Sequence, residues 1–378
     1  MSASRTRSGA GAGSRSRDAV AVLVAVGLCT PALADEMVRI AVTTGQARVT
    51  LSGPSLSVAL LAEDQPREPV AGGAAEVVLS GDELTVNGRP ADVPALSFLA
   101  DGPVRVAGLD LRGEVEVRRG SGGLDVIHAV PMEDYVAAVV EGEMPPSFPP
   151  EALKAQAVAA RSFALAKKLE AVTEGRSWHL GSTVLDQVYR AGRDPRARAA
   201  ALATAGEVLA HDHEPVQAFF HSSCGGQTES GLAALGKDLP YLRSVTCGRC
   251  QAAPRYRWKA ALPADEVGRA LGLPGPVRAV RVTARTAAGR VARLAVEGGG
   301  SKLSLTGADL RQRLGYERLP SLAFEVRVGR GGVAFVGRGA GHGAGLCQWG
   351  AAGMARRGAS YRAILAHYYR GAELLRMY

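Results

Sequence analysis

The sequence predicts an α+β protein in which β-rich modules surround a central helical core, with a smaller α+β insertion. Three observations support this. Residues 35–123 are short β-like runs separated by Gly, Pro and Asp. Residues 131–168 contain two helical patterns around a proline-rich corner. Residues 254–337 alternate between helical and strand-like runs. The chain has 378 residues, enough for one large domain or two ordinary ones.

The first 34 residues are typical of a secretory signal peptide. Four arginines precede a short apolar run, Ala19 to Leu28, and an A-x-A cleavage site follows at residues 32–34. The run is too short to cross a bilayer comfortably, although a retained membrane anchor is the alternative. We therefore expect a mature protein that starts at Asp35, lies in the periplasm or cell envelope, and has no transmembrane segment after cleavage.

Residues 35–123 predict a β-rich accessory domain. Val38 to Val42 and Ala47 to Leu51 are strand-length runs. Residues 114–118 alternate between charged and apolar side chains. A Gly-Ser-Gly-Gly turn then leads into Leu124 to Val130, so a hairpin is expected. No catalytic cluster is visible in this region.

The central stretch predicts a helix, a stiff corner and a second helix. The first helix spans residues 131–142 and is expected to end at Gly142. Glu143 follows, and then Met144-Pro145-Pro146, which holds the backbone extended. Pro149-Pro150-Glu151 suits the start of the second helix. One carboxylate thus stands on rigid backbone, and we expect this helical core to carry the active-site cleft.

The remaining chain supplies loops with polar side chains. Residues 183–192 predict a short polar strand and turn, and residues 196–205 a helix that ends at Gly206. Residues 208–210 and 216–220 predict a hairpin that opens into a glycine-rich loop at His221. A second glycine-rich loop surrounds His342.

The formal net charge is +9, and about +6 without the predicted signal peptide; this mild basicity suits an anionic polymer of the cell envelope. The basic residues are spread along the chain and do not alternate with aromatic residues as a stripe. Nucleic-acid binding is therefore not predicted.

Four blocks together resemble the SpoIID/LytB family of bacterial cell-wall proteins, over residues 124–378. The blocks are MEDYVAAVVEGEMPPSFPPEALKAQAVAARSFAL, DQVYRAG, AFFHSSCGG with PYLRSV after it, and GRGAGHGAGLCQWGAAGMA with HYYRGAEL after it. The β-rich N-terminal third lies outside the strongest part of the resemblance.

The resemblance implies that the substrate is peptidoglycan. One branch of the family consists of lytic transglycosylases, which cut the bond between N-acetylmuramic acid and N-acetylglucosamine in glycan strands stripped of stem peptides. The essential glutamate of these enzymes lies in an EMP triplet, here Glu143. Another branch consists of amidase enhancers, which modify wall hydrolysis by other enzymes. The expected partners are therefore peptidoglycan glycan strands and, in the second case, cell-wall amidases.

A single carboxylate can perform lytic cleavage. It protonates the leaving oxygen, the muramoyl 6-hydroxyl closes a 1,6-anhydro ring, and the carboxylate recovers the proton. Ordinary hydrolysis uses two carboxylates. By spacing alone Glu141 rivals Glu143, whereas Glu133, Asp134 and Glu151 are first-turn acids that commonly serve the helix dipole. The family pattern favours Glu143, and a corner ion pair is the alternative role for it.

Six polar residues are candidate substrate contacts. They are Gln156, Arg161, His221, Ser222, His342 and Gln348. Arg161 either binds a lactyl carboxylate, orients Glu143, or forms a buried ion pair. Each histidine either contacts the sugar or has a structural role.

The cysteines predict either a metal site or a disulfide. His221, Cys224, Cys247 and Cys250 provide a donor set for tetrahedral zinc. In an oxidising compartment Cys224 would instead form a disulfide with Cys247 or Cys250. Cys347 is expected to be a small buried residue.

The cleavage reaction itself needs no cofactor, and no H-E-x-x-H motif supports a metal-dependent amidase.

Overall fold

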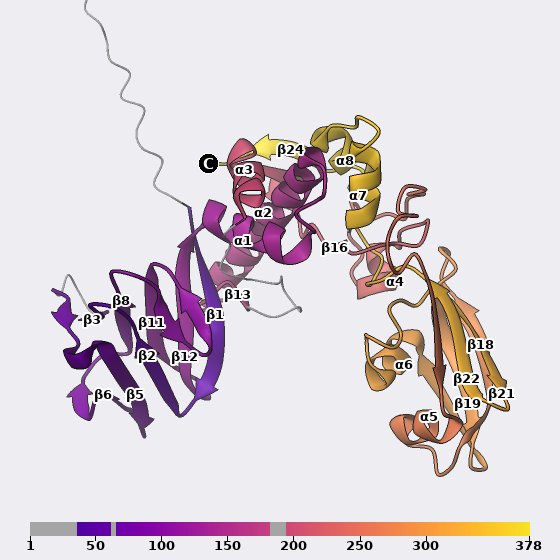
Figure 1. Cartoon of the computed structure of the whole chain (residues 1–378), viewed down its shortest axis with the longest axis horizontal. Coiled ribbons are helices and arrows are strands. Elements are labelled where there is room, and N and C mark those ends of the chain that lie inside the picture. The colour runs from indigo at the N-terminus through magenta and orange to yellow at the C-terminus, as the bar shows by residue number, and fades with distance from the viewer. Residues whose placement is uncertain (1–35, 62–65, 182–193) are drawn as a thin grey trace, which may run out of the picture. The chain divides into compact units, whose positions relative to one another are not determined.

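The computed structural model describes residues 36–61, 66–181 and 194–378 (Figure 1). The predicted signal peptide and the polar segment 183–192 lie outside these ranges. Within them, helices alternate with strands that form six separate sheets, which confirms the α+β class. No helix in the described ranges is both long enough and apolar enough to span a membrane.

Two large sheets build the N-terminal part of the chain, and the strands that form them are labelled in Figure 1 where there is room. One has the order β13 (Leu180–Gly181), β1 (Met37–Gln46), β12 (Gly123–Pro131), β11 (Glu114–Gly120), β8 (Ala95–Leu99), β3 (Ser57–Leu60) and β4 (Glu68–Pro69). The other has the order β10 (Leu109–Leu111), β9 (Val104–Val106), β2 (Arg48–Ser52), β5 (Ala74–Ser80), β6 (Glu83–Val86) and β7 (Arg89–Ala91). A short 3-10 helix, Ala71–Gly73, precedes β5.

Apolar residues of most of these strands are buried in a β-rich core. In β11, for example, Val115 and Val117 are fully buried. The predicted hairpin is confirmed, because β11 pairs antiparallel with β12 as far as Gly120 and Gly123. Since β12 also pairs with β1 and then runs directly into the first helix, the expected division at residue 123 falls within one sheet.

The helical core is built around α2 (Pro150–Thr173). Its neighbours are α1 (Met132–Glu143), α3 (Pro195–Ala203), α7 (Gln348–Ala355) and α8 (Tyr361–Tyr368). The predicted start of α2 is confirmed, with Pro149 as N-cap and Pro150 as the first helical residue. Most residues between Ala152 and Leu165 are buried on all sides. An alanine-rich helix can be surrounded in this way because its small side chains let neighbouring helices approach closely.

The first helix ends one residue later than predicted. Gly142 lies inside α1, and Met144 is the C-cap, with φ −123° and ψ 139°. The residue that stops the helix is therefore Pro145, because a proline excludes the preceding residue from the α region. Glu143 is consequently the last helical residue rather than part of an extended corner.

Two small sheets link distant segments to this core. One contains β15 (Glu214–Pro215), β14 (Glu207–His211) and β24 (Glu373–Arg376), and the other contains β16 (Phe220–His221) and β23 (Leu346–Cys347). The hairpin expected at residues 216–220 is thus wrong in part. A short hairpin does form, because Glu214–Pro215 pairs with β14 and the Val216 amide donates to the Leu209 carbonyl at 3.0 Å. The end of the run departs from it, since Phe220–His221 pairs in parallel with β23.

The insertion has its own hydrophobic core. One sheet contains β17 (Arg257–Leu262), β22 (Gly332–Arg338) and β21 (Phe324–Gly329), and the other β18 (Val277–Arg285), β19 (Val291–Gly298) and β20 (Ser301–Thr306). Its helices are α5 (Ala264–Leu271) and α6 (Gly307–Leu314), and a short α4 (Gly231–Leu235) precedes it. The core joins aromatic residues such as Trp258 and Phe335 to leucines of both helices.

Candidate active site

The corner between α1 and α2 is braced by hydrogen bonds. The Met144 amide donates to the Val140 carbonyl at 3.0 Å, and the Phe148 amide donates to the Pro145 carbonyl at 3.0 Å. The Arg196 guanidinium donates to the Phe148 carbonyl at 2.9 Å and also to the Pro146 carbonyl. Two prolines and one arginine therefore keep the end of α1 in place.

Glu143 lies at this end of α1 and is partly buried. Its chain neighbour Met144 and the corner residue Phe148 are only 3% and 1% exposed. Gln348 Nε2 donates to Glu143 Oε2 at 3.3 Å and lies 3.5 Å from Gln156 Oε1. Both glutamines are buried, Gln156 completely. The carboxylate thus contacts the Gln348 amide at the start of α7, and that amide in turn contacts Gln156 on α2.

The Gln156 side chain has a buried nitrogen donor that no residue of the described ranges uses. This donor is the Nε2 atom of the side-chain amide. An unsatisfied buried donor costs roughly 1–3 kcal/mol, so a fold retains it mainly where a ligand or another group uses it. Gln156, Gln348 and Glu143, the amide–carboxylate cluster, are therefore the strongest candidate active site.

The other acids considered for the catalytic role have structural partners. Glu141 Oε2 accepts the Asp194 amide at 2.8 Å, just before α3. Asp134 pairs with Arg198, and Glu151 accepts both Lys154 Nζ and the Tyr361 amide. Each of these three acids therefore helps to hold two elements together.

Arg161 does not reach the cluster, which contradicts a substrate contact. Its side chain is 0% exposed and pairs with Glu133 on α1, with Nε 3.0 Å from Oε1. The same guanidinium donates to the backbone carbonyls of Ala201 and Glu207 at 3.0 and 2.9 Å. Of the predicted roles, the buried ion pair is the one that fits. Arg161 ties α2 to α1, to the end of α3 and to β14.

His221 and His342 hold loops to one another. His221 Nδ1 lies 3.0 Å from the Ala344 carbonyl, and His342 Nε2 lies 2.7 Å from the Phe220 carbonyl. His342 Nδ1 accepts the Ala344 amide at 3.2 Å. Burial lowers the pKa of His342 to about 4 and that of His221 well below its usual value, so both are neutral at pH 7. With both nitrogens bonded to backbone, His342 is structural, and its predicted sugar contact is corrected.

Ser222 and Trp349 lie close to Gln348. The parallel pairing of β16 with β23 brings the two chains together, and the Trp349 amide donates to the Ser222 carbonyl at 3.1 Å. The Ser222 side chain is exposed, as a substrate contact requires. Trp349 is partly exposed, and its ring meets Phe148 edge-on with centroids 4.9 Å apart. The sequence analysis did not single out Trp349, although its position beside Gln348 in a motif block was a usable signal.

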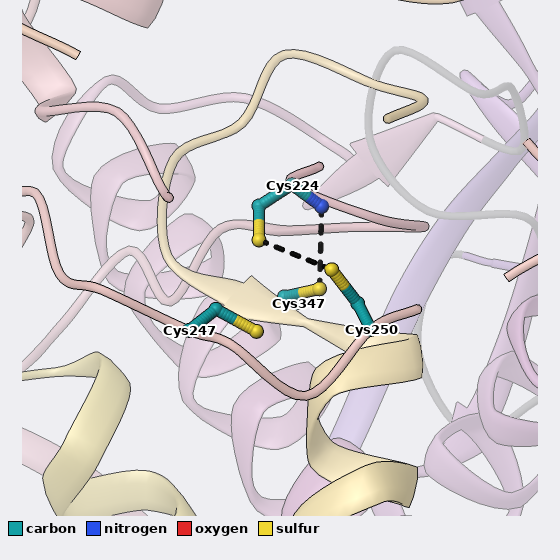
Figure 2. Close-up of side chains that lie close together, drawn as sticks. All are labelled: Cys224, Cys247, Cys250 and Cys347. Atoms are coloured by element: carbon teal, nitrogen blue, oxygen red, sulfur yellow. Dashed lines mark hydrogen bonds between the residues drawn. The ribbon is translucent and has the colours of Figure 1, made fainter. Parts of the chain in front are cut away.

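The cysteine cluster differs from the predicted donor set. Four buried sulfur atoms lie within 4.8 Å of one another (Figure 2), and they belong to Cys224, Cys247, Cys250 and Cys347. His221 is not among them, because its ring turns toward Ala344. No disulfide joins the four, which are all free thiols. Cys347 is buried as predicted, but it is also the fourth member of the group.

Two segments of the chain match known family models. Residues 120–211 match the family model described as Stage II sporulation protein (SpoIID), and residues 245–345 match a domain of unknown function, DUF8618. The chain is 34% identical over 267 residues to Stage II sporulation protein D of Bacillus amyloliquefaciens, covering 66% of this chain and 75% of the relative. The corresponding Bacillus subtilis (strain 168) protein is 32% identical, with the same coverage of 66% and 75%.

A further relative is the Amidase enhancer of Bacillus subtilis (strain 168). It is 27% identical over 292 residues, which cover 62% of this chain and 39% of the relative. The first match covers the α1–α2 corner with Glu143, and the relatives include both a Stage II sporulation protein D and an Amidase enhancer. The chain therefore belongs to the SpoIID/LytB family.

Proposed function

We propose that this protein is a peptidoglycan lytic transglycosylase that cleaves the bond between N-acetylmuramic acid and N-acetylglucosamine in denuded glycan strands. Membership of the SpoIID/LytB family indicates a cell-wall related function, and the signal-like N-terminus fits export to the envelope. The observation that carries the proposal is the partly buried Glu143, which accepts a hydrogen bond from Gln348, whose amide also contacts the buried Gln156.

Glu143 acts as both acid and base in the proposed reaction. Its carboxylic acid protonates the glycosidic oxygen as the bond to the muramoyl anomeric carbon breaks. The 6-hydroxyl of the same sugar then bonds to that carbon, and its proton returns to Glu143. The products are a 1,6-anhydromuramoyl end and a free N-acetylglucosamine hydroxyl. No water is consumed, so no second carboxylate is needed to activate one.

The neighbouring side chains orient this carboxylate and the sugars. Gln348 donates to Oε2 and so limits the rotation of the Glu143 side chain. Gln156 offers its unused Nε2 atom to an N-acetyl oxygen or a hydroxyl. The exposed Ser222 hydroxyl and the Trp349 ring supply a polar contact and an apolar surface for a pyranose.

The products of the reaction test the proposal. Incubation of the protein with denuded glycan strands is expected to release fragments that end in 1,6-anhydromuramic acid, detected by mass spectrometry. Fragments with ordinary reducing ends would instead indicate hydrolysis, which contradicts the mechanism. Binding without any cleavage would favour the second candidate, a non-catalytic enhancer of cell-wall amidases, to which the similarity to the Amidase enhancer points.

Replacing Gln348 with alanine is expected to lower kcat about tenfold to a hundredfold, because the carboxylate loses a contact that orients it. Turnover and glycan binding are measured separately, and binding should change little. Gln227→Ala is a matched control, since Gln227 is exposed and its side-chain amide donates to Ser244 Oγ at 3.1 Å. Equal turnover in both variants would contradict a role for Gln348.

A further inference from the structure

The cysteine cluster joins three segments that are far apart in the chain. Cys224 lies in the loop after β16, Cys247 and Cys250 form a C-x-x-C in the loop before β17, and Cys347 ends β23 (Figure 2). All four side chains are at most 5% exposed. Four buried thiols converge on one point here, which apolar packing alone does not require.

The spacing of the sulfur atoms fits a tetrahedral ion. Zinc–thiolate bonds of about 2.3 Å in a tetrahedron place the sulfur atoms about 3.8 Å from one another. The four Sγ atoms all lie within 4.8 Å, and Cys224 Sγ is 3.5 Å from Cys250 Sγ. A single disulfide would use two of them and leave two buried thiols without a role. All four cysteines are free in the structure, so neither one nor two disulfides are formed.

Hydrogen-bond donors surround the sulfur atoms. Backbone amides of Gly226 and Gly350 donate to Cys224 Sγ and Cys347 Sγ, each at 3.3 Å, and the Cys224 amide also donates to Cys347 Sγ at 3.3 Å. The Tyr368 hydroxyl lies 3.2 Å from Cys247 Sγ. Donors directed at sulfur stabilise thiolates, the form that binds metal.

Glycine at position 350 also keeps space for the cluster. A Cβ atom there would lie 2.6 Å from Cys247 Sγ and 3.1 Å from Cys347 Sγ. The close approach of α7 to the sulfur atoms therefore depends on a residue without a side chain.

A buried arginine supplies positive charge next to the cluster. Arg290 is 3% exposed and donates through Nη2 to the Cys224 carbonyl at 3.0 Å. Its Nε and Nη1 atoms make no hydrogen bond to residues in the described ranges, although Glu229 Oε2 lies 3.9 Å from Nε. Four thiolates around a divalent ion leave a net charge of about −2. Arg290, which also pairs with the buried Glu229, places positive charge beside the Cys224 end of the cluster.

We propose that Cys224, Cys247, Cys250 and Cys347 bind one zinc ion as a structural tetrathiolate centre. The centre locks the C-x-x-C loop and the loop after β16 to the β23–α7 junction. Cys347 is the N-cap of α7, and the next residue is Gln348, whose amide contacts Glu143. The centre therefore positions Gln348, although the metal takes no part in the proposed bond cleavage. The inference does not depend on the proposed function, because it predicts metal content and stability in any case.

Metal analysis of the purified chain tests the proposal. One zinc ion per chain is expected, with no disulfide by thiol counting. Replacement of zinc by Co²⁺ should give the visible and near-ultraviolet absorption of a tetrahedral tetrathiolate site. Removal of the metal by a strong chelator should lower the melting temperature, and zinc should restore it. A chain without metal, or one in which the cysteines form disulfides under non-oxidising purification, would overturn the proposal.

Two variants separate the four-cysteine site from the site that includes His221. Cys347→Ser should lose bound zinc and the thiolate absorption of the cobalt form. His221→Ala should retain one zinc ion, because its ring contacts the Ala344 carbonyl instead of the sulfur atoms. The opposite pattern, zinc kept in Cys347→Ser and lost in His221→Ala, would overturn the assignment. If Cys347→Ser fails to fold, the absorption of the cobalt-substituted native chain still distinguishes four thiolates from three.

Discussion

Replacing Glu143 with glutamine is expected to lower the release of 1,6-anhydro products by about a thousandfold or more. Glutamine keeps the size of the side chain and can still accept the hydrogen bond from Gln348, but it carries no transferable proton. General acid–base catalysis by one group contributes about 10²–10⁴-fold, and here a single group performs both proton transfers. Product release is measured by mass spectrometry on denuded strands, and binding by co-sedimentation.

Glu141→Gln is the matched control for this experiment. Glu141 precedes Glu143 by two residues and accepts the Asp194 amide at 2.8 Å, a contact that a glutamine oxygen preserves. The control variant should keep most of the activity and the native melting temperature. Full activity in Glu143→Gln would contradict the catalytic assignment. Loss of activity in Glu141→Gln alone would transfer the role to Glu141.

Replacing Arg161 with methionine is expected to lower the free energy of unfolding by about 3–5 kcal/mol, the range for breaking a buried ion pair. The change leaves Glu133 without its cation and also removes donors from the carbonyls of Ala201 and Glu207. Methionine keeps much of the apolar volume, so the effect reports the lost charge and hydrogen bonds rather than a cavity. Urea denaturation measures the difference.

A surface ion pair provides the control for the buried Arg161–Glu133 pair. Arg198 pairs with Asp134 at 2.6 Å, but both side chains are largely exposed, at 60% and 45%. Arg198→Met should therefore cost less than about 1 kcal/mol. If Arg161→Met were as stable as the native protein yet lost glycan binding, Arg161 would be a substrate contact and its structural role would be wrong.

The proposed site depends on parts of the chain that are distant in sequence. Glu143 and Gln348 are separated by 205 residues, and Gln348 reaches the carboxylate because α7 packs against α2. Changes near Cys347 or in the C-x-x-C loop are therefore expected to affect the site without touching the glycan. The same arrangement is compatible with an enhancer, in which the cluster binds glycan and does not cleave it.

Local patterns in the sequence were sufficient for much of this description. Alternating valines predicted the hairpin of β11 and β12, and two prolines with Glu151 predicted the start of α2. Spacing alone left Glu141 as a rival to Glu143, and the EMP triplet favoured Glu143 only through the family resemblance. Such features depend on neighbours within a few residues, so a single chain reveals them. The end of α1 was misplaced because Gly142 and Pro145 both stop helices and the proline acted later.

The sequence by itself determined the α+β class, the family and the acid on the braced corner. Only the tertiary structure decided which polar residues meet that acid, that Arg161 is buried against Glu133, and that Cys347 replaces His221 in the cluster. The physical reason is that these contacts arise where β16 pairs with β23 and where α1 and α7 pack on α2. Side-chain direction across such contacts follows from the packing of the whole core, which local periodicity does not encode.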